Sequence, residues 1–151
     1  MRFKLLSVMA AAVGILALGV APASAKTVNW QIVSTNSNWY CGGGYITHPV
    51  SEHVNFKACL VVNANNDAQT VLVVQNTASV AVAIGGLVFF DGGSVSNTTD
   101  CAASTLNPGF TRGCFGPTFH IDSGTRIWGN GNLTLNGVTQ SYGWVDRWVL
   151  A

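Results

Sequence analysis

The chain has 151 residues, of which only 9% are charged, and a formal net charge of +1 at pH 7. So few basic residues, none of them clustered, argue against nucleic acid or an anionic membrane surface as the partner, since both bind grouped Lys and Arg. A chain of this size has room for one ordinary domain with a single core.

Residues 1–25 have the pattern of a secretory signal peptide. Basic residues precede an apolar run over 5–20, and Ala23-Ser24-Ala25 provides the small residues of a cleavage site. The run of about 16 residues is shorter than the roughly 20 that a helix needs to cross a membrane. We therefore expect cleavage after Ala25, and a secreted, extracellular β domain over 26–151 that does not insert into a membrane. That product carries five basic and six acidic residues, a net charge of −1.

The first half of this domain reads as strands and turns. Apolar and polar residues alternate over 27–32, which is typical of a half-buried strand. The clearest alternation predicts a strand over 53–62, with Phe56 and Leu60 on its buried face. An Asn-rich turn and a β-branched segment over 70–75 then complete a hairpin.

The second half is less regular, and it contains no capped amphipathic helix. Gly85-Gly86 predicts a bulge, or a bend between two strands. We interpret 95–116 as a long loop with a turn at 106–109. Asn136-Gly137 is a strong signal for a two-residue hairpin turn. The remaining predicted strands are short and cover 118–121, 125–128, 132–135 and 144–150.

The four cysteines indicate two disulfides, because an exported protein with an even number of cysteines normally pairs them. We predict Cys41–Cys59 and Cys101–Cys114, since each pair closes a short loop on either side of a cysteine-free stretch. Closing such a loop removes roughly 3 kcal/mol of unfolded-state entropy. No Cys or His pair has the spacing of a zinc site, so we expect neither a metal nor a cofactor.

About eight or nine short strands at regular spacing predict an all-β fold. We expect an antiparallel β-sandwich with an immunoglobulin-like layout, or a barrel, stabilised by the two disulfides.

Two clusters have residue types that serve catalysis. Segment 48–53 contains two histidines and the only glutamate, and Glu52 or His53 could act as a general base. We interpret the segment as an exposed loop that leads into the next strand. If Glu52 and His53 were on a strand, they would face opposite sides and would not converge on a substrate. His120 and Asp122 share a face of a predicted strand, but no nucleophile motif accompanies them. We expect no catalytic residues and a protein that is not an enzyme.

Eight Trp and Tyr side chains are many for this length, and flat rings stack on sugars and on protein partners. We assign Trp30 and one of Trp144 or Trp148 to the interior. Trp39 and Tyr40, beside a cysteine, are the best exposed pair.

The disulfide-pinned segment 101–114 offers Phe110 and Arg112 as anchors for a partner, because pinning lowers the ordering cost of binding. The predicted partner-binding residues are thus Trp39, Tyr40, Phe110 and Arg112.

These observations favour a secreted, non-enzymatic binding or assembly module that engages a secreted or cell-surface protein. The contact would be a sheet edge, such as 26–33, the pinned loop or an aromatic patch. Three alternatives remain open: an inhibitor of an extracellular hydrolase, a carbohydrate-binding module whose partner is a glycan, and a small secreted hydrolase.

Overall fold

The computed structural model describes residues 26–150, and the predicted signal peptide lies outside this range. The described chain consists of strands joined by turns, which confirms the all-β prediction. Within it, no helix is long and apolar enough to cross a membrane. The strands are β1 (Thr27–Val28), β2 (Gln31–Ile32), β3 (Trp39–Cys41), β4 (Ile46–His48), β5 (Ser51–Val62), β6 (Asp67–Asn76), β7 (Val82–Gly92), β8 (Val95–Leu106), β9 (Thr111–Phe115), β10 (Phe119–His120), β11 (Arg126–Leu135) and β12 (Val138–Trp148).

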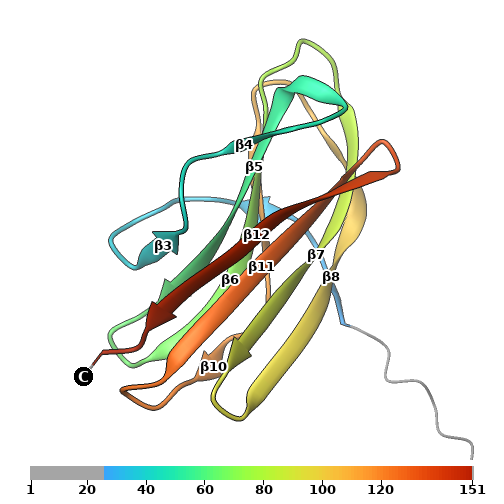
Figure 1. Cartoon of the computed structure of the whole chain (residues 1–151). Helices are drawn as coiled ribbons and strands as arrows, with labels where there is room; N and C mark the ends of the chain where they lie inside the picture. The colour runs from blue at the N-terminus through green and yellow to red at the C-terminus, as the bar shows by residue number, and fades with distance from the viewer. Residues whose placement is uncertain (1–25, 151) are drawn as a thin grey trace, which may run out of the picture.

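The strands form two sheets that pack face to face as a sandwich (Figure 1). The five-stranded sheet has the order β1-β8-β7-β11-β12. The seven-stranded sheet has the order β2-β9-β6-β5-β3, with β4 added to β5 and β10 added to β6. Pairing is antiparallel except between β1 and β8, which are parallel. The predicted sandwich is therefore confirmed, and the sheets do not close into a barrel.

The core lies between the two sheets and follows the predicted alternation in β5. Phe56 and Leu60 are fully buried, together with Leu72 of β6 and with Ile127 and Leu133 of the facing sheet. Burying large apolar side chains of this kind is the dominant favourable term in folding.

Both predicted disulfides are present. Cys41–Cys59 joins the paired strands β3 and β5, and Cys101–Cys114 joins β8 to β9, so it links the two sheets. The predicted hairpin turn at Asn136-Gly137 is also present. Its residues have φ values of 48° and 85°, the positive pair that a type I′ turn requires.

The outward face of the seven-stranded sheet is covered by the N-terminal part of the chain. Because β2 and β3 lie at opposite edges of this sheet, residues 33–38 must cross its outer side. Val33 and Trp39 pack there on the buried side chains of Val71 and Val73. A Cβ on Gly113 of β9 would lie only 2.6 Å from Val33, which shows how closely the segment lies on the sheet.

The structure corrects the predictions for segments 27–32, 95–116 and 48–53. The single strand over 27–32 is two short strands, because the chain passes from one sheet to the other at Asn29-Trp30 and the Trp30 indole donates to the Ala102 carbonyl at 2.8 Å. The long loop over 95–116 is the strand pair β8 and β9 around the predicted turn. Several inward positions of β8 are small or polar, such as the buried Thr99 and Cys101, so alternation of apolar residues does not reveal this strand.

The third correction concerns segment 48–53, which is a tight hairpin between β4 and β5; residues 49, 50, 52 and 53 are exposed as predicted, but His48 is not. His48 is only 1% exposed, and its ring packs against Phe56 at 5.8 Å between centroids. The predicted bulge at Gly85-Gly86 is correct, and it lies within the continuous strand β7.

Candidate functional site

The predicted partner-binding residues on β3 are half-buried rather than open. Trp39 packs edge-on against Phe115 at 5.9 Å, as part of the cover over the seven-stranded sheet. Tyr40 lies under the guanidinium of Arg147, which is 3.2 Å from the ring centroid. Both rings therefore already have partners within the chain.

Phe110 and Arg112 lie at the start of β9, and Arg112 stacks on the Phe110 ring at 4.6 Å. Phe110 is 43% exposed. Strands β6 and β5 separate β9 from β3, so the structure does not bring these two residues together with Trp39 and Tyr40. The four predicted residues form no common patch.

The interior assignment of one late tryptophan is wrong. Trp144 and Trp148 are 63% and 54% exposed, because both project from β12 on the outward side of the five-stranded sheet. Trp30 is half-buried and packs against the core. The exposed rings thus gather on a face that the sequence did not indicate.

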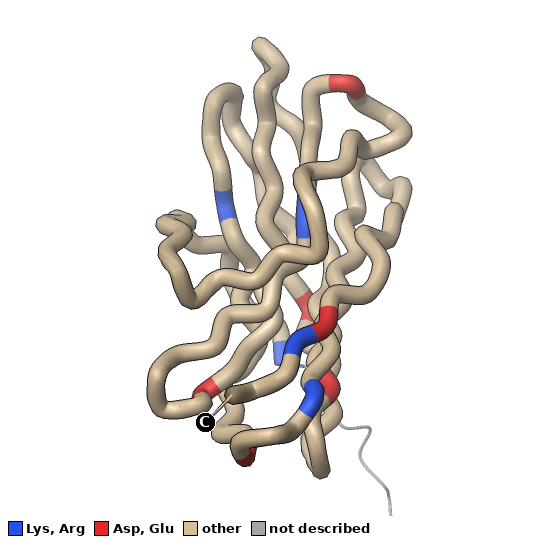
Figure 2. The backbone as a smooth tube through the Cα atoms, turned by 60° about the vertical axis from the view of Figure 1, so that its left-hand side comes forward, with Lys and Arg blue, Asp and Glu red and all other residues tan. Residues whose placement is uncertain are grey.

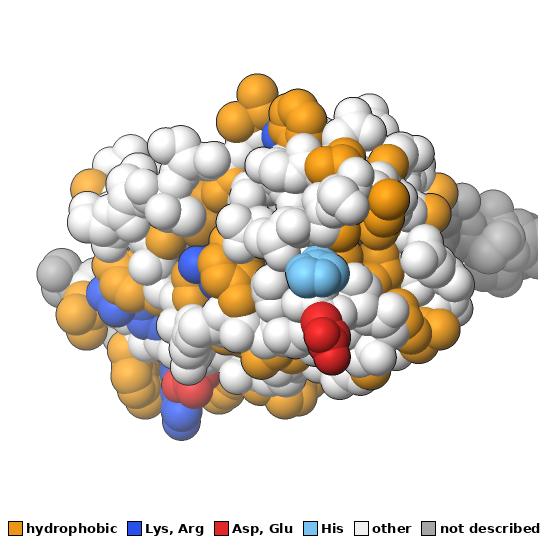
Figure 3. Space-filling view, turned by 90° about the horizontal axis from the view of Figure 1, so that it is seen from above, with side chains coloured by type: hydrophobic (Ala, Val, Ile, Leu, Met, Phe, Trp, Pro, Cys, Tyr) orange, Lys and Arg blue, Asp and Glu red, His pale blue; other side chains and the backbone are white. Residues whose placement is uncertain are grey.

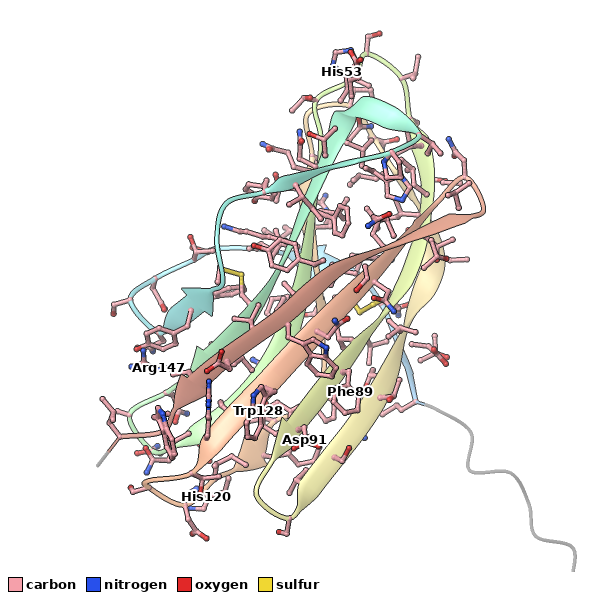
Figure 4. The ribbon with its side chains drawn as sticks, viewed as in Figure 1. His53, Phe89, Asp91, His120, Trp128 and Arg147 are labelled. Atoms are coloured by element: carbon pink, nitrogen blue, oxygen red, sulfur yellow. A yellow bond between two sulfur atoms is a disulfide. The ribbon has the colours of Figure 1, made fainter. Side chains whose placement is uncertain are left out.

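The outward face of the five-stranded sheet carries aromatic and polar side chains in register. Three rows run across β7, β11 and β12: Asp91, Trp128 and Asp146 form the first, Phe89, Asn130 and Trp144 the second, and Leu87, Asn132 and Ser141 the third. Figure 4 shows three of these, Phe89, Asp91 and Trp128, projecting from neighbouring strands on the same side. We call these three rows the aromatic face.

Two adjoining grooves hollow the aromatic face. The first, of about 470 Å³, is lined by Phe89, Asp91, Trp128, Trp144 and Asp146. The second, of about 500 Å³, is lined by Leu87, Phe89, Thr98, Asn130, Asn132, Ser141 and Trp144. They share Phe89 and Trp144, whose rings meet edge to face at 5.3 Å, and this contact orients the exposed indole.

One ion pair borders the first groove. Arg126 donates from Nε and Nη2 to Oδ2 of Asp146, at 2.9 and 2.7 Å, which leaves Oδ1 available to a ligand. The same guanidinium lies 5.5 Å from the ring centroid of Trp128. Because both partners are partly exposed, the pair adds at most about 1 kcal/mol to stability. Its main effect is to hold the carboxylate and the indole in place.

The inward side of β11 explains why this strand lies close to the core. Gly129 and Gly131 face inward, where a Cβ would lie 2.7 Å from Thr70 Oγ1 and 3.0 Å from Leu72 Cδ1. Because these two inward positions have no side chain, this part of the strand lies against β6 and presents Trp128 and its outward neighbours on the other side. The two short strands predicted at 125–128 and 132–135 are therefore one strand.

A bulge in β12 determines which of its side chains face outward at the site. The pairing shifts between Asn130 and Asn132, so that β12 has an extra residue there, and Gly143 adopts a φ of +99°. Tyr142 consequently turns inward, where its hydroxyl donates to the Gly44 carbonyl at 2.9 Å. Its burial raises the pKa of its phenol. Trp144 and Ser141 both remain on the outward face.

The predicted catalytic candidates do not assemble. His53 and His120 lie at opposite ends of the sandwich (Figure 4). Seen from the upper end, a histidine and an acidic side chain lie on a surface of mostly uncharged groups (Figure 3). His120 Nδ1 lies 3.2 Å from Asp67 and is not paired with Asp122. That contact, after the larger effect of the Asn63 amide, lowers the pKa of Asp67.

His48 is isolated from these groups. Burial lowers its pKa, an effect partly offset by the backbone of Leu133 and Val138, although Nε2 has no hydrogen bond of good geometry. Among residues 26–150, no three His, Cys, Asp or Glu side chains gather into a metal site. Figure 2 shows the charged residues scattered along the backbone.

Comparisons with family models, curated proteins and solved structures found no match for this chain.

The sequence does not reveal the aromatic face, because the glycines of β11 predict a break between two short strands. Over residues 128–133, Trp-Gly-Asn-Gly-Asn-Leu alternates large or polar residues with glycine. Glycine inside a strand usually marks a weak point or a close approach of another backbone. Here it marks a close approach, and the intervening Trp128, Asn130 and Asn132 are the outward residues of the site.

Proposed function

We propose that the protein is a non-enzymatic carbohydrate-binding module whose ligand lies on the aromatic face. The observation that carries this proposal is the asymmetry of the sandwich. One outward face is covered by residues 33–38 of the chain itself, whereas the other presents exposed indoles around two grooves. An exposed apolar and aromatic patch of this kind marks a binding surface.

The chemistry of the first groove suits a sugar. The indole of Trp128 lies between Asp91 and Asp146 in the pairing register, so a flat ring is flanked by a carboxylate on each side. A sugar ring has C–H groups that pack on the electron-rich face of an indole, and hydroxyls at its rim that donate to carboxylates. The groove, of about 470 Å³, is shallow and open to solvent, so a sugar ring stacked on it would keep its other face in water.

The same composition is less suited to a protein partner. The centre of a protein interface is depleted of charged side chains. In the aromatic face, carboxylates lie in register with the rings: Asp91 and Asp146 flank Trp128 in the strand pairing, and only the contact between Phe89 and Trp144 joins two rings directly. The inhibitor hypothesis relied on a long pinned loop over 101–114, but most of this segment consists of paired strand residues.

The proposal is tested by co-sedimentation of the mature protein with insoluble cellulose, chitin, xylan and mannan. We expect retention on at least one polymer, and its loss in the double variant Trp128→Ala/Trp144→Ala. Phe110→Ala is the matched control, because it removes an exposed ring elsewhere, and it should bind normally. Circular dichroism checks the fold of each variant.

Three results would overturn the proposal. The first is failure of the folded protein to bind any of the polymers, and the second is equal loss of binding in Phe110→Ala. The third is release of soluble sugar that Asp91→Asn or Asp146→Asn abolishes, because paired carboxylates are the machinery of glycoside hydrolysis.

A further inference from the structure

We infer that the two grooves form one continuous track that holds an extended, neutral polysaccharide chain along β11, rather than a single terminal sugar. This inference rests on the proposed carbohydrate-binding function. It adds the mode of binding and the charge class of the ligand.

The continuity of the track follows from the register of the strands. The grooves share Phe89 and Trp144 as lining residues. Trp128 of the first row and Asn132 of the third lie four positions apart in β11, which is about 13 Å along an extended strand. Beyond the first row, Arg126 pairs with Trp148, and its guanidinium lies 6.0 Å from the centroid of that 54% exposed indole.

Each row offers both a surface to stack on and a group to hydrogen-bond. Trp128 has carboxylates beside it, and Trp144 lies next to Asn130, which is only 9% exposed and donates to the Ser141 hydroxyl at 3.4 Å. The third row combines Leu87 with the partly exposed Asn132 and the exposed Ser141, whose hydroxyl is the accessible polar group. A polymer of sugars repeats a ring and its hydroxyls at regular intervals. The aromatic face repeats the complementary groups in the same direction, so successive sugars would have partners in successive rows.

The charges of the track select a neutral chain. Asp91 and Asp146 contribute two negative charges, and Arg126 neutralises one of them through its ion pair. The first groove therefore keeps a net negative charge that repels a carboxylate or sulfate on a sugar. Hydroxyl-rich neutral sugars meet no such penalty.

The experiment is isothermal titration calorimetry of the mature protein with neutral oligosaccharides, from disaccharide to hexasaccharide. They are derived from a polymer that binds the protein in the co-sedimentation test. We expect the affinity to rise by about tenfold between the short and long members, since each 1.4 kcal/mol of added contact is worth a factor of ten. A carboxylated polymer, polygalacturonate, should bind with lower affinity than the neutral chains. Asp91→Asn removes a negative charge and should reduce this difference in affinity.

Single substitutions assign the two ends of the track. Asn132→Ala should remove the gain for long chains and leave the affinity for the disaccharide unchanged, whereas Trp128→Ala should weaken both. If all lengths bind equally, or Asn132→Ala leaves the gain intact, the extended track is wrong although the proposed function stands. If no oligosaccharide or polymer binds to the folded protein, the proposed function itself fails.

Discussion

Replacing Gly129 by alanine tests whether β11 lies as close to the facing sheet as the site requires. Gly129 is buried between the outward residues Trp128 and Asn130, and a Cβ there would lie 2.7 Å from Thr70 Oγ1 and 3.0 Å from Leu60 Cδ2. Real Cβ atoms do not approach so closely. Either Thr70 or the strand must move.

The expected magnitude combines two opposing effects. Overpacking a dense core costs about 1–3 kcal/mol. Replacing glycine by alanine also restricts the unfolded chain, which stabilises by about 0.4–1 kcal/mol. The net loss in the free energy of unfolding is therefore about 1–2 kcal/mol. Gly44→Ala is the matched control, because a Cβ there meets nothing within 4 Å, and it should be neutral or slightly stabilising.

Urea unfolding followed by tryptophan fluorescence measures both variants. A double variant Thr70→Ala/Gly129→Ala locates the clash, because Thr70 is fully buried and its Oγ1 has no hydrogen-bond partner. In the Thr70→Ala background, Gly129→Ala should cost clearly less, with a coupling energy of at least about 0.5 kcal/mol. If Gly129→Ala behaves like Gly44→Ala, the sheets are not close-packed at this point and the placement of β11 is wrong.

Two further predictions concern the core and pH. Phe56→Ala should cost about 2–5 kcal/mol as a large-to-small core substitution, whereas His53→Ala on the exposed side of β5 should cost little; equal losses in denaturant unfolding would refute the register of β5. Because burial lowers the pKa of His48 below its ordinary 6.5, the unfolded chain binds the proton more tightly than the folded one. The contribution of His48 to the free energy of unfolding should then be constant above about pH 6.5 and fall as pH drops below it, and His48→Gln should flatten that slope.

Strand content and disulfides were predictable because they depend on local patterns. Alternation in β5 is strong, since Phe56 and Leu60 differ sharply from their neighbours, and Asn136-Gly137 satisfies a turn that needs two positive φ values. The long strand β8 was not predictable in this way. Its inward positions include Thr99 and Cys101, which are buried by tertiary packing and a disulfide rather than by being markedly apolar.

The candidate site was missed for a different reason, since it depends on partners distant in sequence. Trp144 and Trp148 could be assigned to the interior or the surface only by knowing the bulge at Gly143, which changes which residues of β12 face outward. Likewise, residues 33–38 decide which outward face is open, because they cover the seven-stranded sheet and leave the five-stranded sheet uncovered. Neither feature has a local signature.

The five tryptophans allow the most direct test of the central claim, that a glycan lies on the aromatic face. Indole N–H signals of the ¹⁵N-labelled mature protein are followed by NMR during titration with a neutral hexasaccharide, and single substitutions assign the signals. The proposed site predicts progressive shifts for Trp128 and Trp144, and unchanged signals for Trp30 and Trp39, which lie elsewhere and already contact Ala102 and Phe115. Shifts confined to Trp39, or no shift at saturating oligosaccharide, would contradict it.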